Sequence, residues 1–364
     1  MVKFTKTLTA VAAIAAISAL ALTGCGRGDS SSGSSGSAAA GFAKDATIGV
    51  ALPQKTSENW VLAENLFNSD LKSAGFKADV QFANNGATEQ QNQISSMISN
   101  GAKVIIVGAV DGSQLGTQLK QAKDAGVTII AYDRALTNTS NVDYYLAYDN
   151  FKVGELQGQA LLDGMKAKKP NGPYNIELFA GSPDDANSKP FFDGAMSVLK
   201  PKIDDGTLKV VSGQVSQNDA ATQGWLAANA QKRMDTLLAA NYTTAPLDGV
   251  LSPNDTLARA IITSVKAAGK PIPVVTGQDS EVESVKSIMA GEQYSTINKD
   301  TSNLVKAAIS MVTDLQQGKT PATTTTSNNG TKDVPTKFLD PVIVTKANAA
   351  QAYANDPTLG PLTK

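Results

Sequence analysis

Residues 104–134 read VIIVGAVDGSQLGTQLKQAKDAGVTIIAYDR, and this stretch decides the fold. Val104–Val107 is an unbroken β-branched run, residues 113–125 have helical spacing, and Gly126 ends them before the second run, Val127–Ala131. A strand without polar alternation is buried on both faces, as in a parallel sheet covered by helices. The stretch therefore predicts two parallel strands joined by a helix, which is the repeating unit of an α/β fold.

The same unit recurs on both sides of this stretch, about every 26 residues. The strands predicted for this first series are 48–52, 80–82, 104–107 and 127–131. The helices between them are 59–74, 88–100 and 113–125. Each of these helices stops at a glycine, Gly75, Gly101 or Gly126, which adopts the left-handed conformation after a helix without a Cβ penalty.

A second series of strands and helices begins after residue 150. Its predicted strands are 176–180, 208–212, 247–251 and 272–276, and its predicted helices are 150–168, 190–200, 219–240, 255–268 and 281–290. Residues 295–317 and 334–347 add one helix and one strand, which we expect to return to the existing sheets. Residues 319–334 are rich in Thr and Asn and are predicted to form a surface loop. Two consecutive α/β series predict two Rossmann-like lobes, each with a parallel sheet flanked by helices.

The N-terminal 24 residues have the pattern of an export signal. Lys3 and Lys6 precede an apolar run at 8–22, which at about 15 residues is too short to span a membrane. Leu22-Thr23-Gly24-Cys25 resembles a lipobox, in which the cysteine is lipidated. Residues 25–44 then carry a Gly/Ser-rich tract that behaves as a flexible tether. We therefore expect an extracytoplasmic protein anchored to the cell membrane through Cys25.

Composition excludes several classes of function. With 32 basic and 33 acidic residues the chain has a net charge of −1, so no nucleic-acid partner is expected. Histidine is absent and Cys25 is the single cysteine, which excludes Ser-His and Cys-His catalysis and typical zinc sites. No phosphate loop or dinucleotide fingerprint follows a strand, so no cofactor and no metal are expected. A glycosidase that uses two carboxylates remains open on composition alone.

Polar side chains gather after the predicted strands, where open parallel sheets bind ligands. These segments are YDR at 132–134, GSPDDAN at 181–187, SPND at 252–255 and GQD at 277–279, with Asn59 and Trp60 after the first strand. An isolated Asp at such a place is often the N-cap of the next helix. Together, carboxylates, amides, one Arg and the chain's two tryptophans, Trp60 and Trp225, favour a polyol ligand, because an aromatic face packs on the C–H face of a sugar.

The chain resembles the sugar-binding proteins of ABC importers, in the xylose, ribose and multiple-sugar branch of the type I periplasmic binding proteins. The resemblance covers residues 46–350. It is carried by VIIVGAVDGSQL, IIAYDR, LAYDNFKVGELQ, NIELFAGSPDD, FFDGAMSVLKP, KRMDTLLAA, VLSPND, VVTGQDSEVESVKSI and AGEQYSTINKD. It implies that a three-segment hinge joins the lobes, with crossings near 149–150, 298–299 and 330–338. The implied lobes are 45–149 with 299–335, and 150–298 with 336–364.

The resemblance also implies roles for individual residues. The implied ligand-binding residues are Asn59, Trp60, Asp133, Arg134, Asp185, Asn187, Trp225, Asn254, Asp279 and Lys299. Asp255 and Gln278 are implied to lie behind them. Two departures bear on specificity: relatives often carry Arg where this chain has Asn59, and the segment ANSKPFF at 186–192 differs from theirs. The identity of the sugar therefore cannot be copied from relatives.

These observations predict a monomeric binding protein, not an enzyme. It would capture a pentose or hexose such as xylose, glucose, galactose or fructose between the lobes and deliver it to a membrane permease with its cytoplasmic ATPase. The alternative is a sugar sensor that presents its ligand to a chemotaxis or signalling receptor.

Overall fold

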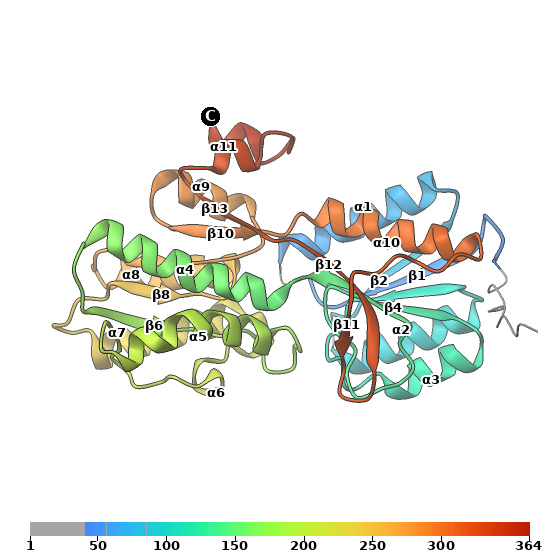
Figure 1. Cartoon of the computed structure of the whole chain (residues 1–364), viewed down its shortest axis with the longest axis horizontal. Helices are drawn as coiled ribbons and strands as arrows, with labels where there is room; N and C mark the ends of the chain where they lie inside the picture. The colour runs from blue at the N-terminus through green and yellow to red at the C-terminus, as the bar shows by residue number, and fades with distance from the viewer. Residues whose placement is uncertain (1–40, 56, 85) are drawn as a thin grey trace, which may run out of the picture. The chain divides into compact units, whose positions relative to one another are not determined.

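The first lobe is built on a seven-stranded sheet in the order β11-β12-β5-β4-β3-β1-β2 (Figure 1). This computed structural model describes residues 41–55, 57–84 and 86–364. Neighbouring strands of the sheet are parallel, except that β11 and β12 are antiparallel. Its strands are β1 (Thr47–Leu52), β2 (Lys77–Phe82), β3 (Val104–Val107), β4 (Thr128–Tyr132), β5 (Tyr144–Tyr148), β11 (Thr325–Asn328) and β12 (Asp333–Leu339). The predicted signal segment and Cys25 lie outside the described residues.

Helices cover both faces of this sheet, because successive strand residues point to opposite sides. These helices are α1 (Glu58–Ser73), α2 (Ala87–Ser99), α3 (Gly116–Asp124) and α10 (Thr301–Gln316). Val104 and Ile106 of β3 pack in the core that includes Phe67 of α1. Ile105 and Val107 pack in the opposite core with Ile94 of α2 and other residues of α2 and α3. The central strands are therefore apolar on both sides, as their sequence predicts.

The second lobe has a parallel four-stranded sheet, β7-β6-β8-β9, and a separate antiparallel pair, β10-β13. Its strands are β6 (Tyr174–Leu178), β7 (Leu208–Val210), β8 (Gly249–Leu251), β9 (Val274–Val275), β10 (Ser295–Asn298) and β13 (Val342–Thr345). Its helices are α4 (Asn150–Lys168), α5 (Ser188–Asp204), α6 (Gln217–Ala220), η1 (Gln223–Trp225), α7 (Ala227–Asn241), α8 (Asp255–Ala267), α9 (Val282–Ala290), α11 (Ala349–Ala352) and η2 (Gly360–Thr363). Helices α4 and α5 pack on one face and α7 and α8 on the other. The prediction of two α/β lobes is confirmed.

The chain passes between the lobes after β5, after β10 and after β12. The first two crossings lie next to Asp149 and Lys299, near the positions that the resemblance implies. The third lies later than predicted, because Thr336–Leu339 of β12 pair with Tyr145–Tyr148 of β5 in the first sheet. Placing the return to the second lobe at residue 336 was therefore wrong, and the chain reaches the second lobe only with β13.

Other parts of the structure also differ from the sequence prediction. The strands β5 and β10 were not predicted, and β11 lies inside the segment expected to be a loop. The single helix predicted over 219–240 is interrupted, because Gly224 and Trp225 have positive φ angles of 67° and 56° and separate α6 from α7. The glycines that end α1, α2 and α3 do have positive φ, at 92°, 81° and 70°.

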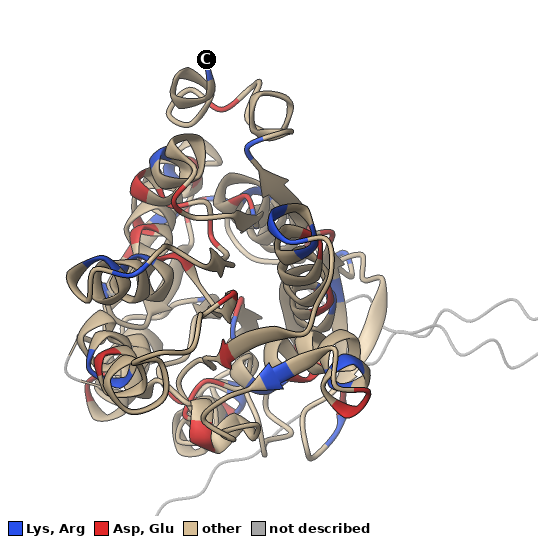
Figure 2. Cartoon of the chain, turned by 90° about the vertical axis from the view of Figure 1, so that its left-hand side faces the viewer, with Lys and Arg blue, Asp and Glu red and all other residues tan. Residues whose placement is uncertain are grey.

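Acidic and basic residues are interspersed over the helices of the second lobe (Figure 2). On α5, for example, Lys189 pairs with Asp193 and Lys200 pairs with Asp204, each one helical turn apart. None of the described helices is long and apolar enough to cross a membrane.

Candidate ligand-binding site

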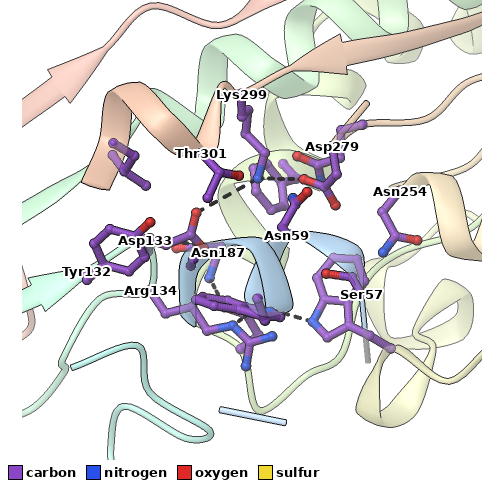
Figure 3. A pocket seen from close by; sticks show the side chains of 17 residues that line it. Ser57, Asn59, Tyr132, Asp133, Arg134, Asn187, Asn254, Asp279, Lys299 and Thr301 are labelled. Atoms are coloured by element: carbon purple, nitrogen blue, oxygen red, sulfur yellow. Dashed lines mark hydrogen bonds and ion pairs between the residues drawn. The ribbon is translucent and has the colours of Figure 1, made fainter. Parts of the chain in front are cut away.

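One cavity brings together the polar segments that follow the strands of both lobes (Figure 3). The first lobe contributes the ends of β4, α1 and α10. The second contributes the loops after β6, β8, β9 and β10, together with α5 and η1. The lining residues are Ser57, Asn59, Trp60, Ala63, Tyr132, Asp133, Arg134, Asp185, Asn187, Phe191, Trp225, Asn254, Gln278, Asp279, Lys299, Thr301 and Leu304. All ten predicted ligand-binding residues are therefore gathered around one space.

Trp60 forms the aromatic wall of the first lobe. It lies in the first turn of α1, and its ring meets that of Tyr132 edge to face with 6.3 Å between centroids. The guanidinium carbon of Arg134 lies 5.4 Å from the Trp60 ring centre, within range of a cation–π contact. A Cβ on Gly108 would lie 3.1 Å from the indole, so glycine leaves room for Trp60. Regular secondary structure and ring packing together fix this wall.

Trp225 forms the aromatic wall of the second lobe, and it is held differently. Its own φ is 56° and follows the 67° of Gly224, so the backbone turns sharply just before the indole. A Cβ on Gly181 would lie 2.1 Å from Cη2 of the indole, which only glycine avoids. The indole Nε1 donates to Asp185 Oδ2 over 3.0 Å. The ring is thus fixed from behind by Gly181 and at its edge by Asp185.

Arg134 and Asp185 join the two lobes beside this aromatic wall. Arg134 Nε lies 3.0 Å from Asp185 Oδ2, with side chains 7% and 4% exposed. Arg134 also donates from Nη1 to the carbonyl of Ala109. Burial raises the pKa of Asp185, and the Arg134 charge opposes that rise. The pair therefore joins the lobes through one contact, whereas Asp185 also accepts from Asn187 N and Trp225 Nε1 within its own lobe.

Lys299 lies at the crossing from β10 to α10 and connects carboxylates from both lobes. Its Nζ is 3.0 Å from Asp279 Oδ1 in the second lobe and 4.0 Å from Asp133 Oδ2 in the first. Burial disfavours the charged amine, but Asp279 and Asp133 outweigh it and raise the pKa of Lys299. The ammonium group is therefore charged at neutral pH and forms ion pairs with the two carboxylates.

Two asparagines complete the polar lining. Asn187 Nδ2 donates to the carbonyl of Asp133 over 3.0 Å, which is a second direct contact between the lobes. Asn254 accepts at Oδ1 from Leu257 N and thereby caps α8. An asparagine amide has two N–H donors, so Asn254 retains donors for a ligand. The N-cap explanation of this residue and a ligand-binding role are therefore compatible.

The two residues expected behind the lining occupy different places. Gln278 lines the cavity itself, which corrects the expectation; its Nε2 donates to Pro253 O, and its buried Oε1 has no hydrogen-bond partner within the described chain. Asp255 is fully buried and is absent from the lining. Its carboxylate accepts from Gln293 Nε2, Glu281 N and Thr296 Oγ1 at 2.7, 3.0 and 2.9 Å. Burial raises the pKa of Asp255 well above its ordinary value.

Sequence reasoning missed several lining residues: Ser57, Ala63, Tyr132, Phe191, Thr301 and Leu304. Phe191 follows the polar loop 181–187 and Thr301 follows Lys299, so proximity to predicted site residues was the available signal. Lys299 Nζ lies 5.4 Å from the Phe191 ring centre. Phe191 therefore adds an aromatic face beside the ammonium group, although no spacing rule indicates it.

The chemistry of this lining is that of reversible polar recognition. It offers carboxylate acceptors, amide and cationic donors, and two indole rings, which suit hydroxyl groups on an apolar ring. Within the described ranges no group of three His, Cys, Asp or Glu side chains is placed to hold a metal ion.

Comparison with known proteins agrees with this geometry. Residues 48–320 match the periplasmic binding protein domain. The chain is 49% identical over 318 residues to the multiple sugar-binding periplasmic receptor ChvE of Rhizobium radiobacter, covering 85% of this chain and 90% of that protein. It is 37% identical over 318 residues to the D-xylose-binding periplasmic protein of Escherichia coli, covering 87% and 92%. The chain belongs to the periplasmic binding protein family.

Solved structures of this family include close structural matches. An ABC transporter solute-binding protein from Clostridium phytofermentans, crystallised with β-D-glucose, matches with a TM-score of 0.83 and 36% identity, over 87% of this chain and all of that one. A carbohydrate transporter solute-binding protein from Chloroflexus aurantiacus, in complex with D-glucose, matches with a TM-score of 0.80 and 32% identity, over 87% and 97%. The family implies an extracytoplasmic location, and this protein shares the fold of these two transporter solute-binding proteins.

Proposed function

We propose that this protein captures a monosaccharide between its two lobes and delivers it to the permease of an ABC importer. The observation that carries the proposal is the pairing of Trp60 and Trp225, one from each lobe, around a cavity lined by carboxylates, amides and cations. Relatives named for sugar binding, and structures that hold glucose, support the same class of ligand.

The proposed recognition uses each wall for a different part of the sugar. The indole rings cover the C–H faces of the pyranose or furanose ring. Asp133 and Asp279 accept hydrogen bonds from hydroxyl groups, and Asn59, Asn187 and Asn254 donate to them. The unpartnered Oε1 of Gln278 is a further acceptor, since a buried acceptor is costly to leave unsatisfied.

Closure of the lobes is proposed to accompany binding. The contacts from Asn187 to Asp133 and from Arg134 to Asp185 join the lobes directly, so an open form would have to break them. A ligand that bridges both walls favours the closed form by its additional contacts there. The permease and its cytoplasmic ATPase would then receive the closed, loaded monomer.

The proposed location follows from the N-terminal sequence. Residues 1–24 would be removed as a signal peptide, and the segment that follows would carry the lipid on Cys25 and tether the lobes to the membrane. The expected tether of residues 25–44 is too long at its end, because Phe42 pairs with Gln316 and packs on Phe76 of the first lobe. Cys25→Ala should release the protein into the soluble fraction of fractionated cells. If the variant remains in the membrane pellet, the lipid anchor is not the means of attachment.

The test of the function is a thermal-shift screen over D-xylose, D-glucose, D-galactose and D-fructose, followed by calorimetry of the hits. At least one sugar should raise the melting temperature and bind with one site per chain. Absence of binding to all pentoses and hexoses tested would reject the proposal. Incubation with oligosaccharides and analysis of products provides a separate check, because turnover would indicate a glycosidase instead.

A second candidate function is supported by one relative's name. The protein from Rhizobium radiobacter is called a receptor, so presentation of the sugar to a signalling or chemotaxis receptor is the alternative to transport. The two roles separate in a deletion strain, which loses uptake of labelled sugar if transport depends on this protein and retains uptake if the protein only signals.

A further inference from the structure

The loop that carries Asp279 has an unusual backbone. Asp279 and Ser280 are consecutive non-glycine residues with positive φ, at 99° and 54°. Side chains other than glycine rarely adopt this region, and such residues persist only where the surroundings hold them. Since Asp279 presents its carboxylate to Lys299 in the cavity, whatever holds this turn also fixes a binding group.

Three hydrogen bonds hold the turn from the side of β10 and α8. Asp279 N donates to the carbonyl of Ile297, and Ser280 N donates to Thr296 Oγ1. Thr296 Oγ1 in turn donates to the buried carboxylate of Asp255. These bonds fix the backbone of the turn but leave the Ser280 side chain without a partner from these elements.

The C-terminal segment supplies that partner. Tyr353 follows α11, which lies beside α9 in Figure 1, and its side chain is 1% exposed in a cluster with Val285, Val344 and Leu359. The Tyr353 hydroxyl donates to Ser280 Oγ over 2.6 Å, across 73 residues of sequence. Burial raises the pKa of Tyr353, so the hydroxyl keeps its proton at neutral pH. A segment outside the cavity lining thus reaches the turn that carries Asp279.

We propose that Tyr353 is a positioning residue, whose hydroxyl fixes Asp279 through Ser280 and so raises the affinity of the sugar site. This inference rests on the proposed function. Without the hydroxyl, the turn would relax from its positive φ angles and spend less time with Asp279 directed at the ligand. Apparent affinity falls in proportion to the fraction of molecules that hold the binding-competent conformation.

Tyr353→Phe removes the hydroxyl and keeps the ring in its cluster. Calorimetry with the sugar identified for the wild type should show affinity reduced about threefold to tenfold, which corresponds to one hydrogen bond. Tyr242→Phe is the matched control. Its buried hydroxyl donates to Glu177 Oε1 at 2.7 Å in the same lobe, and Tyr242 does not line the cavity. This control should lose at least as much stability in urea, because the hydroxyl bonds a carboxylate, but it should keep wild-type affinity.

Ser280→Ala removes the other half of the bond and gives an independent variant. It should weaken binding as Tyr353→Phe does, and the double variant should bind no more weakly than either single one. Equal affinities for wild type and both single variants would overturn the inference, as would additive losses in the double variant. If the wild type itself binds no monosaccharide, the proposed function fails, which is a different outcome.

Discussion

Trp60 and Trp225 line the same cavity from opposite lobes, but their backbones are built in different ways. Trp60 belongs to a regular helix and packs on Tyr132 of a central strand. Trp225 lies in a turn with positive φ angles, and Gly181 packs so closely on its ring that no Cβ would fit. The first wall therefore depends on ordinary packing, whereas the second depends on backbone conformations that few sequences tolerate.

The buried polar groups that support the two sides of the cavity differ in the same sense. In the first lobe the buried amide of Gln90 donates to Gly108 O and accepts from Val110 N, so the support is neutral. In the second lobe the buried carboxylate of Asp255 supports the turn that carries Asp279. A neutral support is insensitive to pH, but a buried carboxylate is not. We therefore expect the second lobe to be the more fragile half of the site.

The largest contrast is expected from two glycine substitutions. Gly181→Ala should abolish detectable sugar binding, because its Cβ would lie 2.1 Å from the Trp225 indole and displace it. Gly108→Ala should weaken binding only a few-fold, since its Cβ would lie 3.1 Å from Trp60, where small shifts suffice. Calorimetry of both variants measures this, with circular dichroism to confirm folding. Equal losses would contradict the proposed difference between the walls.

The carboxylates around Lys299 give the next contrast. Asp279→Asn should reduce affinity about 10- to 100-fold, as expected for loss of a charged hydrogen-bonding group. Asp133→Asn should cost less than tenfold, because Asp133 is farther from Lys299, at 4.0 Å against 3.0 Å. Both substitutions keep the side-chain shape, and asparagine tolerates positive φ. A larger loss of affinity for Asp133→Asn than for Asp279→Asn would contradict this order.

Substitutions of the two tryptophans should differ less in their effect on sugar affinity. Trp225→Phe should weaken binding about threefold to tenfold, because it loses ring area and the hydrogen bond to Asp185. Trp60→Phe loses ring area and weakens the cation–π contact with Arg134, and it should weaken binding about two- to threefold. Titration of each variant with the same sugar tests the order, and a greater loss for Trp60→Phe would contradict it.

The smallest expected effect is on how the free energy of unfolding depends on pH. Burial raises the pKa of Asp255 in the folded protein, so the folded state binds more protons than the unfolded state above the ordinary pKa. Its contribution to stability is therefore greatest in acid and declines as the pH rises above about 4. Urea unfolding of wild type and Asp255→Asn between pH 4 and 7 should show a weaker decline in the variant. Parallel curves would mean that Asp255 keeps an ordinary pKa.

The sequence predicts what is periodic in this molecule. The apolar runs that form β1, β3 and β4 and the glycines after α1, α2 and α3 are confirmed, because periodicity and helix ends leave local signals. The turn at Trp225 was predicted as helix, because a single glycine inside a helical pattern does not indicate that two consecutive residues adopt positive φ. The strand β11 was missed because its residues, TTSN, are polar and lie at the edge of the sheet.

In the site, too, the residues with a local sequence signal were predicted and those that depend on tertiary packing were not. Residues directly after strands were named from sequence, and the structure gathers them around one cavity. Gln278 was expected behind the site but lines it, because the direction of a side chain in a strained loop depends on the backbone angles next to it. Phe191 and the support from Tyr353 depend on tertiary packing between distant segments, which local spacing does not encode.

The central claim is that one sugar is held between the two tryptophan walls. Trp60 and Trp225 are the only tryptophans of the chain, so fluorescence of Trp60→Phe and Trp225→Phe observes one wall at a time. Addition of the sugar should change the emission of both variants, with each midpoint equal to the dissociation constant of that variant from calorimetry. A change at one tryptophan and none at the other would contradict a ligand held between the lobes.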